Sequence, residues 1–132
     1  MKIKTSELKV ILETKKLCAE VMKATFNAPK QYRFSIVAKL QNLSLEILET
    51  LYRSNEVFVL NASPRQLQQR IDMQQQALSQ FNVLSYMLKT AHAKKCITNK
   101  QHAQISDIIN TCTKLTGGWI KSEINAIINE KT

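Results

Sequence analysis

Residues 113–122, TKLTGGWIKS, place two adjacent glycines inside the most regular helical pattern of the chain. Each glycine costs a helix interior roughly 1 kcal/mol relative to alanine. Gly117 and Gly118 fall largely off the apolar face of this helix, so they either permit a bend before Trp119 or let another backbone approach from outside. The face itself follows from the helical spacing of Ile105, Ile108, Ile109, Cys112, Leu115 and Trp119.

The composition indicates one all-α domain. The chain has 132 residues, of which 44% are hydrophobic, and only two glycines and two prolines. It is long enough to bury a core without disulfides or metal, and it holds too few chain-breaking residues for a many-stranded sheet. We therefore expect a single domain over residues 1–132.

Helix starts and stops divide this domain into four helices. Pro29 ends the first helix, because proline biases the preceding residue away from helical geometry. Ser63 with Gln66, and Thr98 with Gln101, have the spacing of capping boxes that begin the third and fourth helices. Short connections make neighbouring helices antiparallel, so the sequence predicts an up-down-up-down four-helix bundle. The expected helices span about 6–26, 30–54, 64–91 and 99–129.

The second helix carries a wider apolar sector than a four-helix bundle requires. Phe34, Leu45 and Tyr52 form a second row, about 120 to 140° around the helix from its main stripe. A large core could absorb this row. Alternatively, the row and the two glycines form an interface between subunits, which would consist of Phe34, Leu45, Tyr52, Gly117 and Gly118.

The charge of the chain is strongly basic. It has 19 Lys and Arg against 10 Asp and Glu, a formal net charge of +9 and a pI near 9.6. This charge indicates an anionic partner, although it could also serve solubility alone. Residues 21–45 and 73–106 contain no acidic residue, and the antiparallel topology brings both segments to one end of the bundle. We expect sequence-nonspecific contacts there with nucleic-acid phosphates. The candidate nucleic-acid-binding residues are Lys23, Lys30, Arg33, Lys39, Lys89, Lys94, Lys95 and Lys100.

The sequence shows no pattern typical of an active site or a metal centre. Gly-rich phosphate loops, HExxH and two-Cys-two-His spacings are absent. His92, Cys96, His102 and Cys112 lack the short paired spacing of metal ligands, and a Cys96–His92 pair has no acidic residue nearby to orient it. We expect a protein that is not an enzyme and that uses no cofactor and no metal.

The cellular compartment is predicted from what the chain lacks. The three cysteines, Cys18, Cys96 and Cys112, form no CxxC pair, which fits buried thiols in a reducing compartment. No apolar run approaches the roughly 18 residues of a membrane span, and Glu7 precedes any apolar stretch long enough for a signal peptide. We expect a cytoplasmic protein without a membrane partner.

The chain contains the motifs FNAPKQYRF at 26–34, ITNKQ at 97–101 and GGWIKS at 117–122. Together they resemble the Avd family, the accessory variability determinants of diversity-generating retroelements. Residues 26–34 are similar to the family's Phe-Pro-Lys followed by Arg-Phe. The resemblance covers roughly residues 9–122. The chain departs from the family pattern at Asn82 and Tyr86, where members carry arginines four apart.

The resemblance implies a basic four-helix bundle that assembles into a homopentameric ring and works without catalysis of its own. It also implies binding to a reverse transcriptase and to template RNA or cDNA during mutagenic copying and retrohoming. A related group of four-helix proteins, encoded in 23S ribosomal-RNA intervening sequences, shares the fold and part of the pattern. The alternative hypothesis is therefore a structural oligomer of that type with an unknown ligand.

Overall fold

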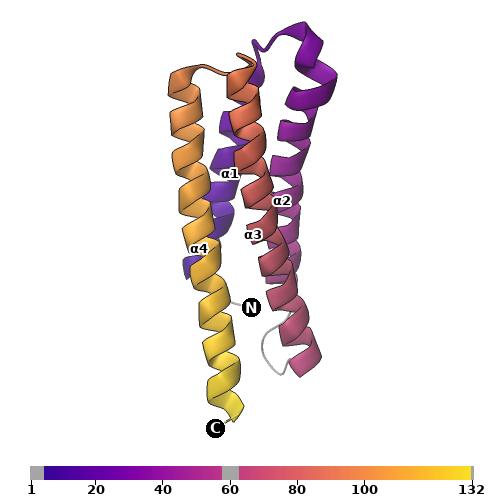
Figure 1. The fold of residues 1–132 in the computed structure, drawn as a ribbon. Helices are drawn as coiled ribbons and strands as arrows, with labels where there is room; N and C mark the ends of the chain where they lie inside the picture. The colour runs from indigo at the N-terminus through magenta and orange to yellow at the C-terminus, as the bar shows by residue number, and fades with distance from the viewer. Residues whose placement is uncertain (1–4, 58–62, 132) are drawn as a thin grey trace.

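Four long helices form an antiparallel bundle in the computed structural model, which describes residues 5–57 and 63–131 (Figure 1). No strand occurs within these ranges, so the predicted all-α class is confirmed. None of the described helices is long and apolar enough to span a lipid bilayer. The helices are α1 (Thr5–Thr25), α2 (Ala38–Glu56), α3 (Pro64–Ala93) and α4 (Asn99–Lys131), and two short helical turns precede α2.

The helices follow the up-down-up-down order expected from their short connections. α1 and α3 each pack against both α2 and α4, so α2 and α4 occupy opposite corners of the bundle. The α1–α2 and α3–α4 connections lie at the same end, at the top of Figure 1. Segments more than 50 residues apart in sequence therefore lie close together at this end.

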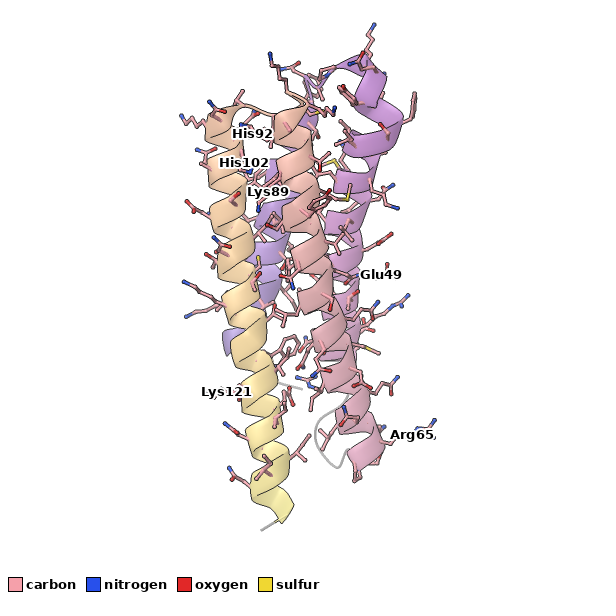
Figure 2. The ribbon with its side chains drawn as sticks, in the orientation of Figure 1. Glu49, Arg65, Lys89, His92, His102 and Lys121 are labelled. Carbon is pink, nitrogen blue, oxygen red and sulfur yellow. The ribbon has the colours of Figure 1, made fainter. Side chains whose placement is uncertain are left out.

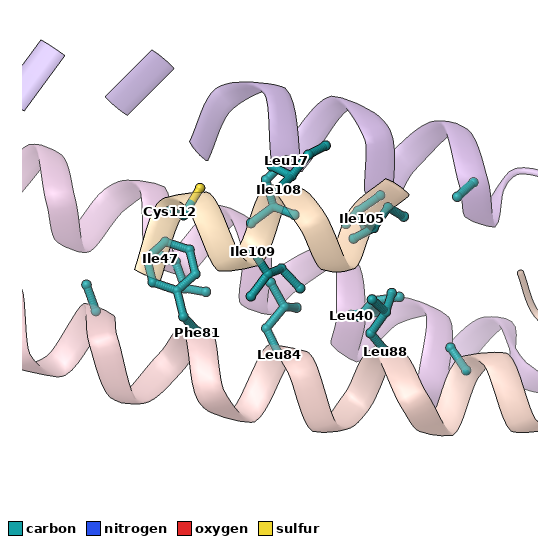
Figure 3. Packing of buried hydrophobic residues seen from close by; sticks show 14 of the residues in the cluster. Leu17, Leu40, Ile47, Phe81, Leu84, Leu88, Ile105, Ile108, Ile109 and Cys112 are labelled. Atoms are coloured by element: carbon teal, nitrogen blue, oxygen red, sulfur yellow. The ribbon is translucent and has the colours of Figure 1, made fainter. Parts of the chain in front are cut away.

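The core is a continuous apolar cluster to which all four helices contribute. Burying one Leu, Ile or Phe side chain contributes about 1.5 to 3 kcal/mol. The cluster holds the bundle together without a disulfide, because all three cysteines are free and buried. Its members at the centre of the bundle include Leu17, Leu40, Ile47, Phe81, Leu84, Ile105 and Cys112 (Figure 3).

Side chains next to the N-termini of α3 and α4 cap these helices. Ser63 Oγ accepts from the Gln66 backbone N–H at 3.2 Å, and Gln66 Oε1 accepts from the Ser63 N–H at 2.8 Å. Thr98 and Gln101 form the same reciprocal pair, with distances of 3.1 and 2.9 Å. Both predicted capping boxes are confirmed, and they satisfy backbone donors that a helix start leaves without partners.

The start of the second helix differs from the prediction. The pattern predicts one helix over residues 30–54, but the residues before Ala38 are not α-helical. Lys30–Tyr32 forms a 3-10 turn (η1), and Arg33–Val37 forms a π-helix (η2). The wider π turn lets Val37 reach the core while the chain turns out of the connection.

This irregular turn changes the position of Phe34. π-helical hydrogen bonds join residues five apart, so counting 100° per residue fails across η2. Phe34 therefore lies before the α-helical part of the second helix, and the face that it shares with Leu45 and Tyr52 stays a prediction. Its ring is 90% exposed, the largest exposure among the large hydrophobic side chains described.

A buried ion pair lies near the opposite end of the bundle. Arg70 Nε of α3 donates to Glu123 Oε1 of α4 at 2.6 Å, and the side chains are only 1% and 5% exposed. Trp119 Nε1 donates to the same oxygen at 2.9 Å. The Arg70 guanidinium also lies 5.1 Å from the centre of the Trp119 ring. The carboxylate thus has two charged or polar donors in a site that is almost closed to water.

Backbone groups of α2 complete the surroundings of this arginine. Arg70 Nη1 donates to the carbonyl oxygens of Ser54 at 2.9 Å and Val57 at 3.1 Å. Ser54 Oγ in turn donates to the Arg70 carbonyl at 3.1 Å and accepts from Gln74 Nε2 at 3.2 Å. We call Ser54, Arg70, Gln74, Trp119 and Glu123 the buried polar cluster; it joins α2, α3 and α4 at one level of the bundle.

Candidate nucleic-acid interface

The end of the bundle that holds the two connections carries all eight predicted nucleic-acid-binding residues, and we call it the basic end. Each of the eight is exposed. Within the described residues none of them forms an ion pair. Figure 2 shows Lys89, His92 and His102 toward this end, and Lys121 and Arg65 toward the other. The eight are Lys23, Lys30, Arg33, Lys39, Lys89, Lys94, Lys95 and Lys100.

The α3–α4 connection holds one of these lysines in a strained conformation. The Cys96 N–H donates to the Ala91 carbonyl at 2.8 Å and the Lys95 N–H to the His92 carbonyl at 3.0 Å, the two hydrogen bonds of a Schellman motif. Lys95 occupies the left-handed position of this motif, with φ of 61°. Glycine is the usual residue there, because a side chain in this conformation costs about 1 kcal/mol. The chain therefore has a lysine at a position where the backbone conformation favours glycine.

Two histidine rings stack between α3 and α4 beside this connection. The centroids of His92 and His102 are 4.5 Å apart and the ring planes differ by 8°. His92 Nε2 donates to Asn99 Oδ1, which orients the ring. Burial, followed by the proximity of His92 and Lys89, lowers the pKa of His102. His102 is therefore neutral at pH 7 and supplies ring surface rather than charge.

A pocket of about 530 Å³ opens between the end of α1 and the α3–α4 connection. Lys23 of α1 and Lys95 of the α3–α4 connection contribute its cations. Asn27, Thr98 and Asn99 contribute amide and hydroxyl groups. Side chains of these types bind phosphate oxygens and base edges in nucleic-acid complexes. The pocket thus links the two acid-free segments with groups suited to a nucleotide.

The predicted interface residues lie on separate surfaces of the monomer. Leu45 and Tyr52 are exposed on α2, where Lys15 Nζ of α1 lies 5.5 Å from the Tyr52 ring centre. Gly117 and Gly118 lie on α4, which continues as α-helix through both of them. A Cβ added at either glycine would meet no atom within 4 Å. The packing of the monomer therefore does not require glycine at these positions.

The three thiols are core side chains. Burial raises the pKa of Cys18 and Cys96, and it raises the pKa of Cys112 to about 11. Cys18 Sγ donates to the Ser44 carbonyl at 3.3 Å. A thiol with a raised pKa is a poor nucleophile at neutral pH. In the described part of the chain, no three His, Cys, Asp or Glu side chains gather closely enough to hold a metal ion.

Uncharged residues of the basic end were not predicted from the sequence. Phe26, which directly follows α1, is 84% exposed, and Asn27 lines the pocket. The cations could be found by counting missing acidic residues, but exposure of an aromatic residue depends on the path of the chain after the helix ends. The available signal was local: Phe26 stands between Lys23 and Lys30 in a segment without acidic residues.

Comparisons with known proteins assign the family. A family model described as bAvd-like matches residues 9–123 of the 132-residue chain. No curated protein and no solved structure matches. The match spans α2 and α3 completely, most of α1 and α4, and both connections of the basic end. The chain therefore belongs to the bAvd-like family.

Proposed function

We propose that this protein is a non-enzymatic accessory protein that binds nucleic acid and a retroelement reverse transcriptase. In this role it supports template-directed synthesis of mutagenised cDNA. The basic end holds the template RNA or the cDNA through phosphate contacts, and a ring of identical subunits multiplies that surface. The contribution of the protein is positioning.

One observation carries the proposal: two acid-free segments meet at one end of the bundle, and their eight cations stay exposed and without carboxylate partners in the described structure. A basic surface meant only for solubility does not need this segregation. Unpaired lysines and arginines on one surface are the electrostatic footprint of a polyanion site. Family membership adds support, because the resemblance to Avd proteins implies the same class of partner.

The arrangement of apolar and glycine surfaces supports self-association into a closed ring. A ring needs two different complementary surfaces on each subunit, so that each copy contacts the next head to tail. The exposed Leu45 and Tyr52 lie on α2, whereas Gly117 and Gly118 lie on α4. These helices occupy different corners of the bundle, so the two surfaces are distinct, as a head-to-tail contact requires. We propose a homopentamer joined through these surfaces.

The side chains of the bundle support a role without catalysis. The three thiols are buried and protonated, and the charges that act on His102 come from His92 and Lys89 rather than from a carboxylate that could orient a base. The protein would then act through binding energy alone. Its activity should be visible only together with the reverse transcriptase.

Binding of labelled single-stranded RNA to the purified protein, measured by fluorescence anisotropy, tests the nucleic-acid part. Phosphate contacts release counterions, so affinity for a single strand should fall by about 300-fold or more between 50 and 200 mM salt if six or more contacts form. Unrelated sequences should bind within a few-fold of each other. Absence of binding at 50 mM salt would falsify this part of the proposal.

Co-expression with an affinity-tagged reverse transcriptase from a diversity-generating retroelement tests the protein partner. The expected result is retention of the protein on the tagged enzyme after nuclease treatment, and cDNA synthesis that depends on its presence. If the protein neither binds RNA nor stays with the enzyme, the intervening-sequence type of structural oligomer becomes the better reading.

Light scattering at micromolar concentration tests the ring. The expected mass is a multiple of the 15.1 kDa subunit, five in a pentamer. Gly118→Leu should lower this mass while leaving the helical circular dichroism intact, because the monomer has room for the side chain. A wild-type particle of monomer mass would contradict the assembly.

A further inference from the structure

Two phenylalanines in the α1–α2 connection leave nearly all of their surface in water. Phe26 is 84% and Phe34 is 90% exposed, the two largest exposures among the large hydrophobic side chains described. Scattered apolar residues on a surface need no explanation, but two rings within nine residues of one connection form a local apolar feature.

The fold itself does not require either ring. Other side chains anchor the connection to the core: Ala28, Tyr32 and Ile36 pack against the apolar cluster, and Val37 belongs to it. The backbone turn is closed by hydrogen bonds from the Ala28 N–H to the Thr25 carbonyl at 3.1 Å and within the helical turns that follow. Other residues therefore already anchor the connection to the core, and neither ring is needed for this.

The charge around the rings identifies the kind of partner. Lys23, Lys30 and Arg33 stand beside them in sequence, all three are exposed, and no acidic residue occurs from residue 21 to residue 45. A partner that covers both the rings and the cations must present apolar faces next to negative charge. Single-stranded nucleic acid does so in every nucleotide, because each base has a free face beside a phosphate. A duplex presents the phosphates but hides the base faces in its stack.

We propose that Phe26 and Phe34 stack on unpaired bases, so that the basic end prefers single-stranded RNA or DNA over duplex. This inference rests on the proposed nucleic-acid function and adds the kind of strand. The strand would pass from the α1–α2 connection toward the α3–α4 connection, since Lys23 and Asn27, on either side of Phe26, both line the 530 Å³ pocket that reaches Lys95.

The test compares a labelled 20-nucleotide single strand with the matching 20-base-pair duplex by anisotropy at fixed salt. Wild type should prefer the single strand. Removal of one stacking ring lowers affinity for a single strand by about tenfold, so Phe26→Ala/Phe34→Ala should lower it by about 10²-fold and change duplex affinity less than twofold. Phe26→Leu/Phe34→Leu should lose most of the same affinity, whereas Phe26→Tyr/Phe34→Tyr should keep it, because leucine is apolar without a planar face.

Tyr86→Ala is the matched control, since it removes another exposed aromatic ring, from α3, outside the connection. It should leave the strand preference unchanged. All variants should keep the wild-type circular dichroism and particle mass, because the rings do not contribute to the core.

Several results would overturn the inference. Equal loss for single strand and duplex, full retention by the leucine variant, or wild-type affinity in the alanine variant would each exclude stacking while leaving phosphate binding intact. A fall in particle mass would make Phe34 a subunit contact, and loss of reverse-transcriptase retention with unchanged RNA affinity would make the rings a protein-docking site. Absence of binding to either strand type would instead remove the proposed function itself.

Discussion

A pair of charged side chains is buried toward one end of the bundle, and the charged side chains at the other end are exposed and unpaired within the described residues. In the buried polar cluster, Arg70 and Glu123 are nearly inaccessible, and the arginine donates to the Glu123 carboxylate and to two backbone carbonyls. At the basic end, eight cations are exposed and unpaired within the described residues. Charge that stabilises the fold is thus enclosed and compensated, whereas charge that is free to bind a partner is left in water.

The largest expected effect concerns the buried pair. Glu123→Ala leaves Arg70 as an uncompensated buried charge and should destabilise the protein by about 3 to 5 kcal/mol. The free energy of unfolding, measured by urea denaturation at fixed protein concentration, checks this value.

Glu49→Ala is the matched control for this substitution. Glu49 and Arg53 have the same 2.6 Å oxygen-to-nitrogen distance as the buried pair, but their side chains are 59% and 65% exposed. An exposed pair contributes about 0.3 to 0.5 kcal/mol. A loss for Glu123→Ala no larger than that of Glu49→Ala would show that burial of the pair is unimportant.

Charge reversal at the basic end should affect binding and not folding. Changing Lys94, Lys95 and Lys100 together to Glu should weaken RNA binding by about 100-fold at moderate salt and reduce the slope of the salt dependence. The free energy of unfolding should stay within about 1 kcal/mol, as is usual for exposed positions. Anisotropy and urea denaturation on the same samples measure both quantities.

The control for this variant carries the same change in net charge. Lys9, Lys16 and Lys121 are exposed outside the acid-free segments. Their simultaneous change to Glu should weaken binding by much less. Equal losses for the two triple variants would mean that only total charge matters and that the basic end is not a localised site.

Features that depend on local sequence were predictable. The capping boxes at Ser63 and Thr98 follow from side chains within three residues of the helix start, and the topology follows from the short connections. The basic end was predictable for the same reason, because antiparallel helices bring alternate connections together.

Features that depend on distant partners were not predictable. Arg70 and Glu123 are 53 residues apart, and Arg70 stands among seven glutamines between residues 66 and 80, a polar stretch that does not indicate burial. Its burial could have been inferred only from its position on the helix, one turn before the buried Gln74. The π-helix of η2 was missed because an apolar pattern counted at 100° per residue contains no sign of a wider turn.

A substitution at Lys95 tests whether this residue strengthens binding at the basic end while lowering the stability of the fold. Lys95→Gly relieves the left-handed strain and should stabilise the protein by about 0.5 to 1 kcal/mol. The same change removes a cation of the pocket and should weaken RNA binding by several-fold. Urea denaturation and anisotropy together check the two opposite effects.

The control is Lys94→Ala, because Lys94 has φ of −89° and carries no such strain. This variant should weaken binding without a gain in stability. If Lys95→Gly fails to stabilise the protein, the lysine at this position is not strained. The left-handed conformation of Lys95 then does not lower the free energy of unfolding.

The smallest expected effect is a pH dependence that arises at the histidine stack. The pKa of His102 is lowered in the folded protein, first by burial and then by His92 and Lys89. The unfolded chain therefore binds a proton more readily than the folded protein as the pH falls through about 6.5, the ordinary histidine value. By linkage, stability is highest above this pH and declines below it.

Thermal unfolding at pH 7.5 and pH 5.5 measures this contribution. His102→Gln should flatten the decline in Tm between the two pH values by about 1 °C, which corresponds to a few tenths of a kcal/mol for a chain of this size. His92 and Lys89 remain in this variant, so a change in slope can be assigned to His102. An unchanged slope would mean that another group causes the pH response. A steeper slope would mean that protonated His102 stabilises the fold, contrary to the effect expected from burial and from Lys89. Bound RNA should reverse the sign, because phosphates next to the stack favour the protonated ring and make binding stronger as the pH falls.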